Sequence, residues 1–156
     1  MSLKSGKLSD FNQELMLRIS SDDERLISDH EIARMWYPRT AILNSMSRYN
    51  FYITTDFGTR GQEHNDFSVI SVWAYNNNGD WFWVDGICVK QTMEKNIDDL
   101  FRLVSEYRPQ SVGLEISGQQ YAFVSWLQGE MMNRNIWFNF ATNKNNQPGI
   151  QPVADK

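Results

Sequence analysis

Two runs of β-branched and aromatic residues flank one short turn, and they constrain the fold more than any other part of the chain. The first run, FSVISVWAY, covers Phe67–Tyr75, and the second, WFWVDGICV, covers Trp81–Val89. Side chains of these types favour extended strands. The Asn78-Gly79 pair between the runs is a strong signal for a tight hairpin turn. The sequence therefore predicts two antiparallel strands that lie side by side.

Further strands and helices are predicted on both sides of this hairpin. Strands are expected at Phe51–Phe57, Ser111–Ile116 and Asn135–Ala141. One helix begins at Thr92 and ends before Pro109, and a second begins at Ser117-Gly118. Each helix has apolar residues at the spacing of one helical face: Ile97, Leu100, Phe101 and Val104 in the first, and Phe123, Val124, Leu127 and Met131 in the second. The predicted order is β-β-β-α-β-α-β, an α/β fold with a mixed sheet and helices on its faces.

The first 50 residues have a different pattern from the rest of the chain. Phe11–Ile19 is a short amphipathic stretch. Ser28 followed by Glu31 fits a capping box, which predicts a short helix through about Trp36. Residues 39–50 are expected to be a connector. We therefore predict a linker segment at 1–50 and an α/β domain at 51–156.

Two of the predicted strands end in a carboxylate. Asp56 ends FYITTD, and Glu115 ends the apolar run SVGLE. Burying an unpaired carboxylate costs several kcal/mol, so a buried acid at a strand end calls for a compensating cation. In a βαβ arrangement the carboxyl ends of the strands gather at one edge of the sheet. If the first and fourth strands are adjacent and parallel, Asp56 and Glu115 become neighbours.

Neighbouring carboxylates repel each other, and a divalent cation between them removes the repulsion. Oxygen ligands favour Mg²⁺ or Mn²⁺, and two such ions about 3.5–4 Å apart can hydrolyse phosphodiesters. Asp66, just before the second strand, is a weaker third candidate and is expected mainly to begin that strand. The plainer alternative is that these acids are ordinary residues at strand ends and loops.

Composition narrows the class of protein. With 156 residues, 41% of them hydrophobic, the chain can build one sizeable core. A single cysteine, Cys88, excludes a disulfide within the chain and suits a reducing compartment, and we expect it to be a small buried residue on its strand. No apolar run approaches the roughly 20 residues of a membrane span. The net charge of -4 is unusual for an autonomous nucleic-acid-binding protein, which generally presents a basic face.

The order of elements, with acids on the first and fourth strands, resembles that of ribonuclease H-like nucleases. More closely, FYITTDFGTRGQEHNDFSVISVWAYNNNGDWFWVDGICVK resembles the start of the nuclease domain in the large terminase subunit of tailed bacteriophages. SVGLEISGQQYAFVSWLQ resembles the fourth strand and following helix of that family. FNQELMLRISSDDERLISDHEI is similar to its link from the ATPase domain. The resemblance as a whole covers roughly residues 8–156.

The resemblance implies a DNA endonuclease that cuts concatemeric double-stranded DNA during phage genome packaging. Asp56 and Glu115 would hold two Mg²⁺ or Mn²⁺ ions, with Asp66 as a further candidate ligand. The implied partners are double-stranded DNA, the terminase ATPase domain, the small terminase subunit and the portal, with no membrane. The implied location is the cytoplasm of an infected or lysogenic bacterium.

The chain departs from this family in two respects. The family has a third carboxylate on a helix after the fifth strand, whereas the acids after Glu115 here are Glu130, inside a predicted helix, and Asp155, in the tail. No GxxxxGK[ST] motif is present. These departures predict a nuclease domain that lacks its closing helix and cuts DNA weakly or not at all. Two alternatives stay open: another ribonuclease H-like nuclease of the resolvase or transposase type, and a non-catalytic interaction module.

Overall fold

The computed structural model describes residues 28–57, 67–114, 120–143, 145–146 and 148. It divides the chain into two units, residues 1–38 and residues 39–156. In the first unit, helix α2 (Asp29–Met35) begins at Ser28 with the predicted capping box, because the Ser28 hydroxyl accepts from the Glu31 N–H and the Glu31 carboxylate accepts from the Ser28 N–H. The predicted domain division after residue 50 stays a prediction.

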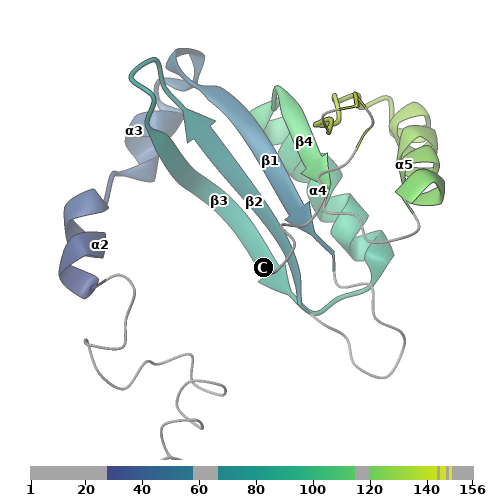
Figure 1. The fold of residues 1–156 in the computed structure, drawn as a ribbon, viewed down its shortest axis with the longest axis horizontal. Coiled ribbons are helices and arrows are strands. Elements are labelled where there is room, and N and C mark those ends of the chain that lie inside the picture. Colours follow the sequence, from purple (N-terminus) through teal and green to yellow (C-terminus); the bar gives the residue numbers. More distant parts are fainter. Residues whose placement is uncertain (1–27, 58–66, 115–119, 144, 147, 149–156) are drawn as a thin grey trace, which may run out of the picture. The chain divides into compact units, whose positions relative to one another are not determined.

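The second unit contains the sheet and the helices that pack with it (Figure 1). Residues 39–50, predicted to be a connector, form two short helices instead, because Ile42 is buried in the core. No helix among the described residues has both the length and the apolar character needed to cross a membrane. The elements are α3 (Arg39–Leu43), the 3-10 helix η2 (Met46–Arg48), β1 (Asn50–Asp56), β2 (Ser68–Tyr75), β3 (Trp81–Val89), α4 (Met93–Tyr107), β4 (Ser111–Leu114) and α5 (Gln120–Arg134).

The four strands form one mixed sheet in the order β3-β2-β1-β4. Strands β1, β2 and β3 form an antiparallel meander, and β4 pairs parallel to β1 after the chain crosses over through α4. The predicted α/β class, the hairpin and the adjacency of the first and fourth strands are confirmed. This order is the one expected from the resemblance to ribonuclease H-like nucleases.

The predicted fifth strand, Asn135–Ala141, is wrong as a strand. The structure has a single parallel bridge there, between Val112 and Phe140. The Val112 N–H donates to the Asn139 carbonyl, and the Ala141 N–H donates to the Val112 carbonyl, both at 2.8 Å. The segment therefore lies along β4 as expected, but its backbone pairs only around this one residue.

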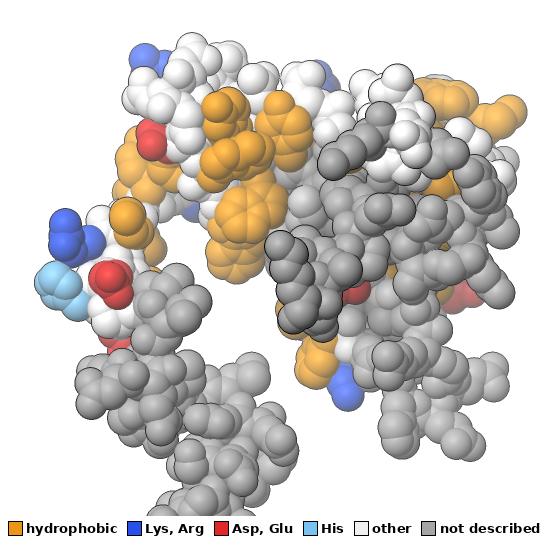
Figure 2. All heavy atoms as spheres, viewed as in Figure 1, with side chains coloured by type: hydrophobic (Ala, Val, Ile, Leu, Met, Phe, Trp, Pro, Cys, Tyr) orange, Lys and Arg blue, Asp and Glu red, His pale blue; other side chains and the backbone are white. Residues whose placement is uncertain are grey.

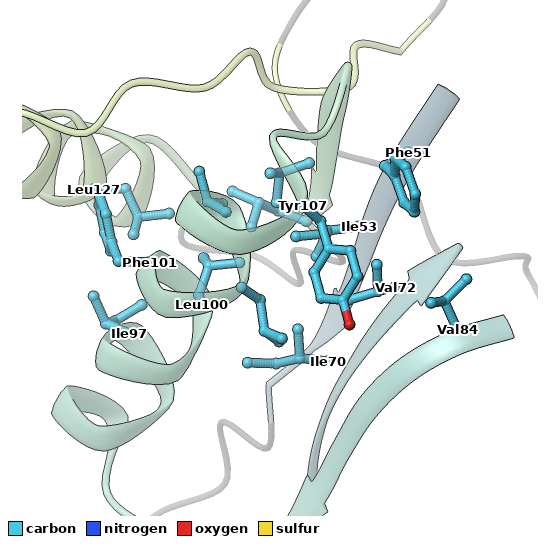
Figure 3. Packing of buried hydrophobic residues seen from close by; sticks show 14 of the residues in the cluster. Phe51, Ile53, Ile70, Val72, Val84, Ile97, Leu100, Phe101, Tyr107 and Leu127 are labelled. Carbon is cyan, nitrogen blue, oxygen red and sulfur yellow. The ribbon is translucent and has the colours of Figure 1, made fainter. Parts of the chain in front are cut away.

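One face of the sheet, here called the inner face, packs against α4 (Figure 3). Side chains alternate along β1 and β2, so every second residue enters this core. Helix α4 contributes the apolar stripe predicted from its spacing, and α5 adds a second stripe. The buried residues include Phe51, Ile53, Ile70, Val72 and Ala74 from the strands, Ile97, Leu100, Phe101 and Val104 from α4, and Val124, Leu127 and Met131 from α5.

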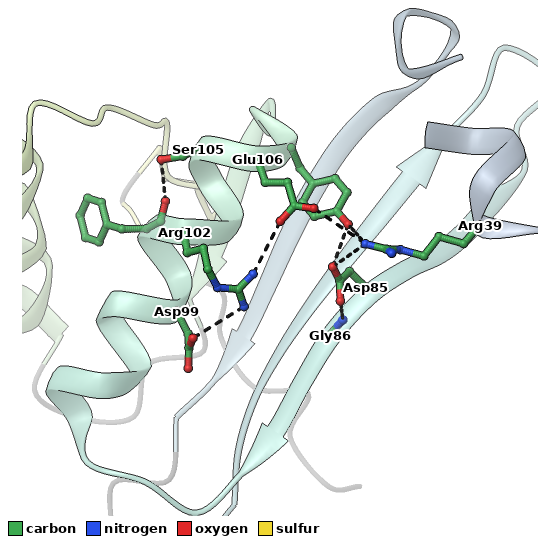
Figure 4. A network of polar contacts seen from close by, with 9 residues as sticks. Arg39, Asp85, Gly86, Asp99, Arg102, Ser105 and Glu106 are labelled. Carbon is green, nitrogen blue, oxygen red and sulfur yellow. Dashed lines mark hydrogen bonds and ion pairs between the residues drawn. The ribbon is translucent and has the colours of Figure 1, made fainter. Parts of the chain in front are cut away.

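A polar network ties α3, β3 and α4 together at this core (Figure 4). The Tyr107 hydroxyl donates to the Asp85 carboxylate at 2.7 Å. Arg39 donates to the same carboxylate at 2.9 Å and also to the Tyr107 hydroxyl oxygen. Burial, and then the hydrogen bond to Asp85, raises the pKa of Tyr107 to about 12. The network therefore anchors the first helix of this unit to the sheet.

This raised pKa predicts a loss of stability at alkaline pH. The folded chain holds the phenol proton more tightly than the unfolded chain, whose tyrosine pKa is near 10. The resulting stabilisation is complete below about pH 10 and is lost as the pH rises to about 12. It is worth at most about 2.7 kcal/mol for a shift of this size. Urea titrations should show the free energy of unfolding falling more steeply across this window in the wild type than in Tyr107→Phe, and parallel profiles would contradict the assignment.

Candidate metal site

Asp56 is the last residue of β1, and the residues on either side of it are fixed in the core. Thr55 is buried, and its hydroxyl donates to the Gly113 carbonyl of β4 at 3.2 Å. Phe57 is also buried, and its ring centroid lies 5.8 Å from that of Phe123 in α5. Because both neighbours point inward, the backbone that carries the Asp56 carboxylate is held in place from two sides.

The described pairing between β1 and β4 ends one residue before each of the candidate acids Asp56 and Glu115. The described register runs from Tyr52 opposite Ser111 to Thr55 opposite Leu114. Asp56 follows Thr55, and Glu115 follows Leu114. Glu115 and Asp66 lie outside the described residues, so their assignment as ligands stays a prediction.

The structure corrects one premise of the sequence analysis, the burial of Asp56. This residue is exposed on the face of the sheet opposite α4, here called the outer face. The alternation along β1 explains the difference, because the inward positions are Phe51, Ile53 and Thr55. Asp56 is therefore accessible to a ligand from solvent, and a cation is not needed to offset its burial.

Cys88 lies on the same outer-face row as Asp56, since Asp56 pairs with Val69 and Val69 pairs with Cys88. It is exposed, so the expectation of a buried cysteine is wrong. Strands lie about 4.8 Å apart, which puts Cys88 roughly 10 Å from Asp56 across the sheet. That separation is too long for the two side chains to share one ion. Cys88 is therefore excluded as a co-ligand of Asp56.

Within the described part of the chain, no group of three or more His, Cys, Asp or Glu residues could hold a metal ion. No ion pair with Asp56 occurs there either, so its charge is not neutralised by a described cation. An exposed carboxylate on a strand end can accept a divalent cation without first breaking a salt bridge to any of the described cations. Asp56 is therefore suited to be one ligand of a site whose other ligands come from elsewhere.

The structure also shows a supporting contact that the sequence analysis missed. The Thr55–Gly113 hydrogen bond joins β1 to β4 one residue before the acid. A threonine at an inward position of a strand is a weak signal by itself, because its hydroxyl could find any of several partners. Its partner became identifiable only once the parallel register of β1 and β4 was known.

Comparisons with known proteins give no sequence relative. No protein-family model matches the chain, and no characterised protein matches it significantly in sequence.

Among solved structures, the fowlpox virus resolvase in complex with Holliday junction DNA overlaps at a TM-score of 0.43 and 14% identity, covering 68% of this chain and 63% of that one. Thermus thermophilus RuvC in complex with a Holliday junction substrate overlaps at a TM-score of 0.41 and 13% identity, covering 65% of this chain and 66% of that one. A second structure of the fowlpox virus Holliday junction resolvase overlaps at a TM-score of 0.38 and 14% identity, covering 62% of this chain and 66% of that one. The chain thus spans about two thirds of each of these proteins or slightly less, and its fold assignment rests on its own strand order.

The exposure of Asp56 predicts that its charge contributes to ion binding and not to folding. Asp56→Asn should change the free energy of unfolding by less than about 0.5 kcal/mol, as is usual for exposed positions. Saturating Mn²⁺ should raise the melting temperature of the wild type, because a ligand present at 100 times its dissociation constant stabilises by about 2.7 kcal/mol. The increase should vanish in Asp56→Asn.

Asp80→Asn is a matched control, since Asp80 lies in the hairpin at the opposite end of the sheet. This variant should keep the Mn²⁺-dependent increase in melting temperature. An equal increase in Asp56→Asn and the wild type would show that Asp56 does not bind the ion.

Proposed function

We propose that this chain is a metal-dependent nuclease domain of the ribonuclease H-like type that cuts DNA at an Asp56–Glu115 metal site. The observation that supports this most directly is the parallel pairing of β1 with β4, whose last described pair, Thr55 and Leu114, immediately precedes both acids. If that register continued by one residue, position 56 would lie opposite position 115. The next pair in a parallel sheet is about 4.8 Å away between strands, within the span of one or two ions with carboxylate ligands.

The chemistry follows from the charges. Two carboxylates at this spacing repel each other and attract divalent cations, so Asp56 and Glu115 would hold Mg²⁺ or Mn²⁺, with Asp66 as the third candidate ligand. Bound ions of this kind activate a water molecule and offset the charge that develops on the phosphate. The role of this chain is to fix the position of the carboxylates, and the buried neighbours Thr55 and Phe57 do so for Asp56. Its exposure leaves that carboxylate open to a DNA backbone.

The finer proposal is that the DNA is a concatemeric phage genome and that the chain is the nuclease domain of a large terminase subunit. The support is the resemblance of residues 51–90 and 111–128 to that family, together with the matching strand order. On this proposal the ATPase domain, the small terminase subunit and the portal are its partners. A resolvase of the same general type would differ in substrate, because it would prefer four-way junctions to linear or supercoiled duplex.

DNA cutting is tested with the protein in excess over supercoiled plasmid, so that slow cutting by an incomplete ligand set is seen. We expect conversion to nicked and linear DNA in Mn²⁺ and no conversion with a chelator. Asp56→Asn and Glu115→Gln should each lower the cutting rate at least a hundredfold, since removing a metal ligand removes ion-dependent catalysis. Asp80→Asn is the control and should cut at the wild-type rate. Cutting that the chelator leaves unchanged, or cutting that both ligand variants retain, would reject the proposed metal site at Asp56 and Glu115.

A parallel assay on a synthetic four-way junction separates the two finer roles. A terminase nuclease should cut the arms of the junction and a linear duplex at similar rates. Preferential cutting at the branch point would reject the terminase role and favour a resolvase.

A further inference from the structure

The outer face of the sheet carries an aromatic surface that the proposed chemistry does not use. Antiparallel pairing places the rings from β1, β2 and β3 side by side on this face. Figure 2 shows hydrophobic side chains gathered over these strands on the side turned toward the viewer. We call this group the aromatic half of the outer face; its members are Tyr52, Trp73, Tyr75, Trp81 and Trp83.

Two tryptophans dominate this surface. Trp81 is 55% exposed and Trp83 is 64% exposed. Together they leave roughly 300 Å² of side-chain surface in water, taking about 250 Å² for a whole tryptophan side chain. The ring of Trp81 lies 5.3 Å from that of Tyr52 and 4.6 Å from that of Tyr75, centroid to centroid. The rings already support one another, so ordering them in a complex costs little additional entropy.

The rest of the outer face is made of smaller side chains. Toward Asp56 the next rows hold Thr54, Ser71 and Gly86, and then Val69 and Cys88, which we call the small half. Gly86 has a local role, because a Cβ there would lie 2.9 Å from the Trp83 ring. The Trp83 ring therefore extends over Gly86, and the rest of the small half is shallow.

Charge identifies the kind of partner. Among the described outer-face positions of β1, β2 and β3, Asp56 is the one charged residue, and it lies at the end. A nucleic-acid surface needs Lys or Arg side chains to neutralise phosphates, and this face has none among those positions. Aromatic enrichment with few charges is the composition of the core of a protein–protein interface.

We propose that the outer face is the contact between two copies of this chain, packed sheet on sheet about a two-fold axis. The axis lies in the plane of contact, runs perpendicular to the strands and passes between the rows of Tyr52 and Thr54. Rotation about this axis places the aromatic half of one copy on the small half of the other. Trp73 then faces Ser71, and Trp81 faces Cys88, of the second copy. Isologous contacts of this kind need one self-complementary surface, and two sheet faces pack well at about 10 Å with their strands nearly aligned.

The size of the surface fits this pairing. A standard interface buries about 800 Å² on each partner, and the two tryptophans alone supply over a third of it. Tyr52, Trp73, Tyr75 and the small half surround them on the same face. Each copy carries a net charge of -4, and Asp56 is the one charged side chain among the described positions of the contact surface, so the copies repel each other at long range. Association should therefore strengthen as salt screens the repulsion.

The experiment is sedimentation velocity on the purified chain at about 100 µM, well above the dissociation constants of specific interfaces. We expect a species of twice the 18.3 kDa chain mass, whose fraction rises when salt is raised from about 0.05 M to about 0.5 M. Trp83→Lys should reduce dimer formation at least tenfold, because it places two charges in the contact. Trp137→Lys is the matched control, since Trp137 is equally exposed at 63% and lies outside the sheet, and it should dimerise as the wild type does.

Each outcome decides the proposal without reference to nuclease activity. A chain that is monomeric at this concentration, or equal loss of dimer in both lysine variants, would reject it. Binding of a single-stranded oligonucleotide that Trp83→Lys abolishes and salt weakens would reject it in favour of a base-stacking surface. Circular dichroism melts confirm that each variant is folded, and Trp81→Ala provides a second substitution on the same face should Trp83→Lys melt early.

Discussion

The burial of one face of α4 against the inner face of the sheet is the interaction on which the rest of this structure depends. This helix carries the chain from β3, at one edge, across to β4, at the other edge beside β1. The crossover is stable because Ile97, Leu100 and Phe101 are removed from water and pack against the inner side chains of the strands. Without it, β4 would have no reason to lie parallel to β1, and the strand end that carries Asp56 would have a neighbour only on its β2 side.

Much of this arrangement could be predicted because it follows from simple periodicities. The hairpin followed from two strand-like runs around Asn78-Gly79, and the buried stripe of α4 followed from its helical spacing. The short helices in residues 39–50 could not be predicted, because they depend on Ile42 and on Arg39 reaching Asp85 in a distant strand. The segment 135–141 has strand-like residues, yet strand formation also needs a partner edge, and its backbone pairs with β4 only around Val112.

For the candidate site, hydrophobicity alone could predict the position of Asp56 and could not predict its environment. The sequence correctly places Asp56 at the end of a strand. The period of two along FYITTD also indicates that Asp56 is exposed, because if Phe51 and Ile53 point inward, Thr55 does too, and Asp56 must point outward. The aromatic face could not be predicted as one surface, since only the pairing of the strands places Trp73, Trp81 and Trp83 together on the outer face.

Asp56 and the aromatic half share the outer face, so one surface would serve two purposes. A second copy seated there by the proposed two-fold axis would lie over the row that contains the carboxylate, opposite the row of Asn50, Tyr75 and Trp81. The dimer would then be an inactive form in which the Asp56 carboxylate is covered, and the monomer would be the form whose carboxylate is open to DNA. Dilution would raise the nuclease activity per molecule and a higher protein concentration would lower it, so the rate per molecule would depend on the concentration of the chain.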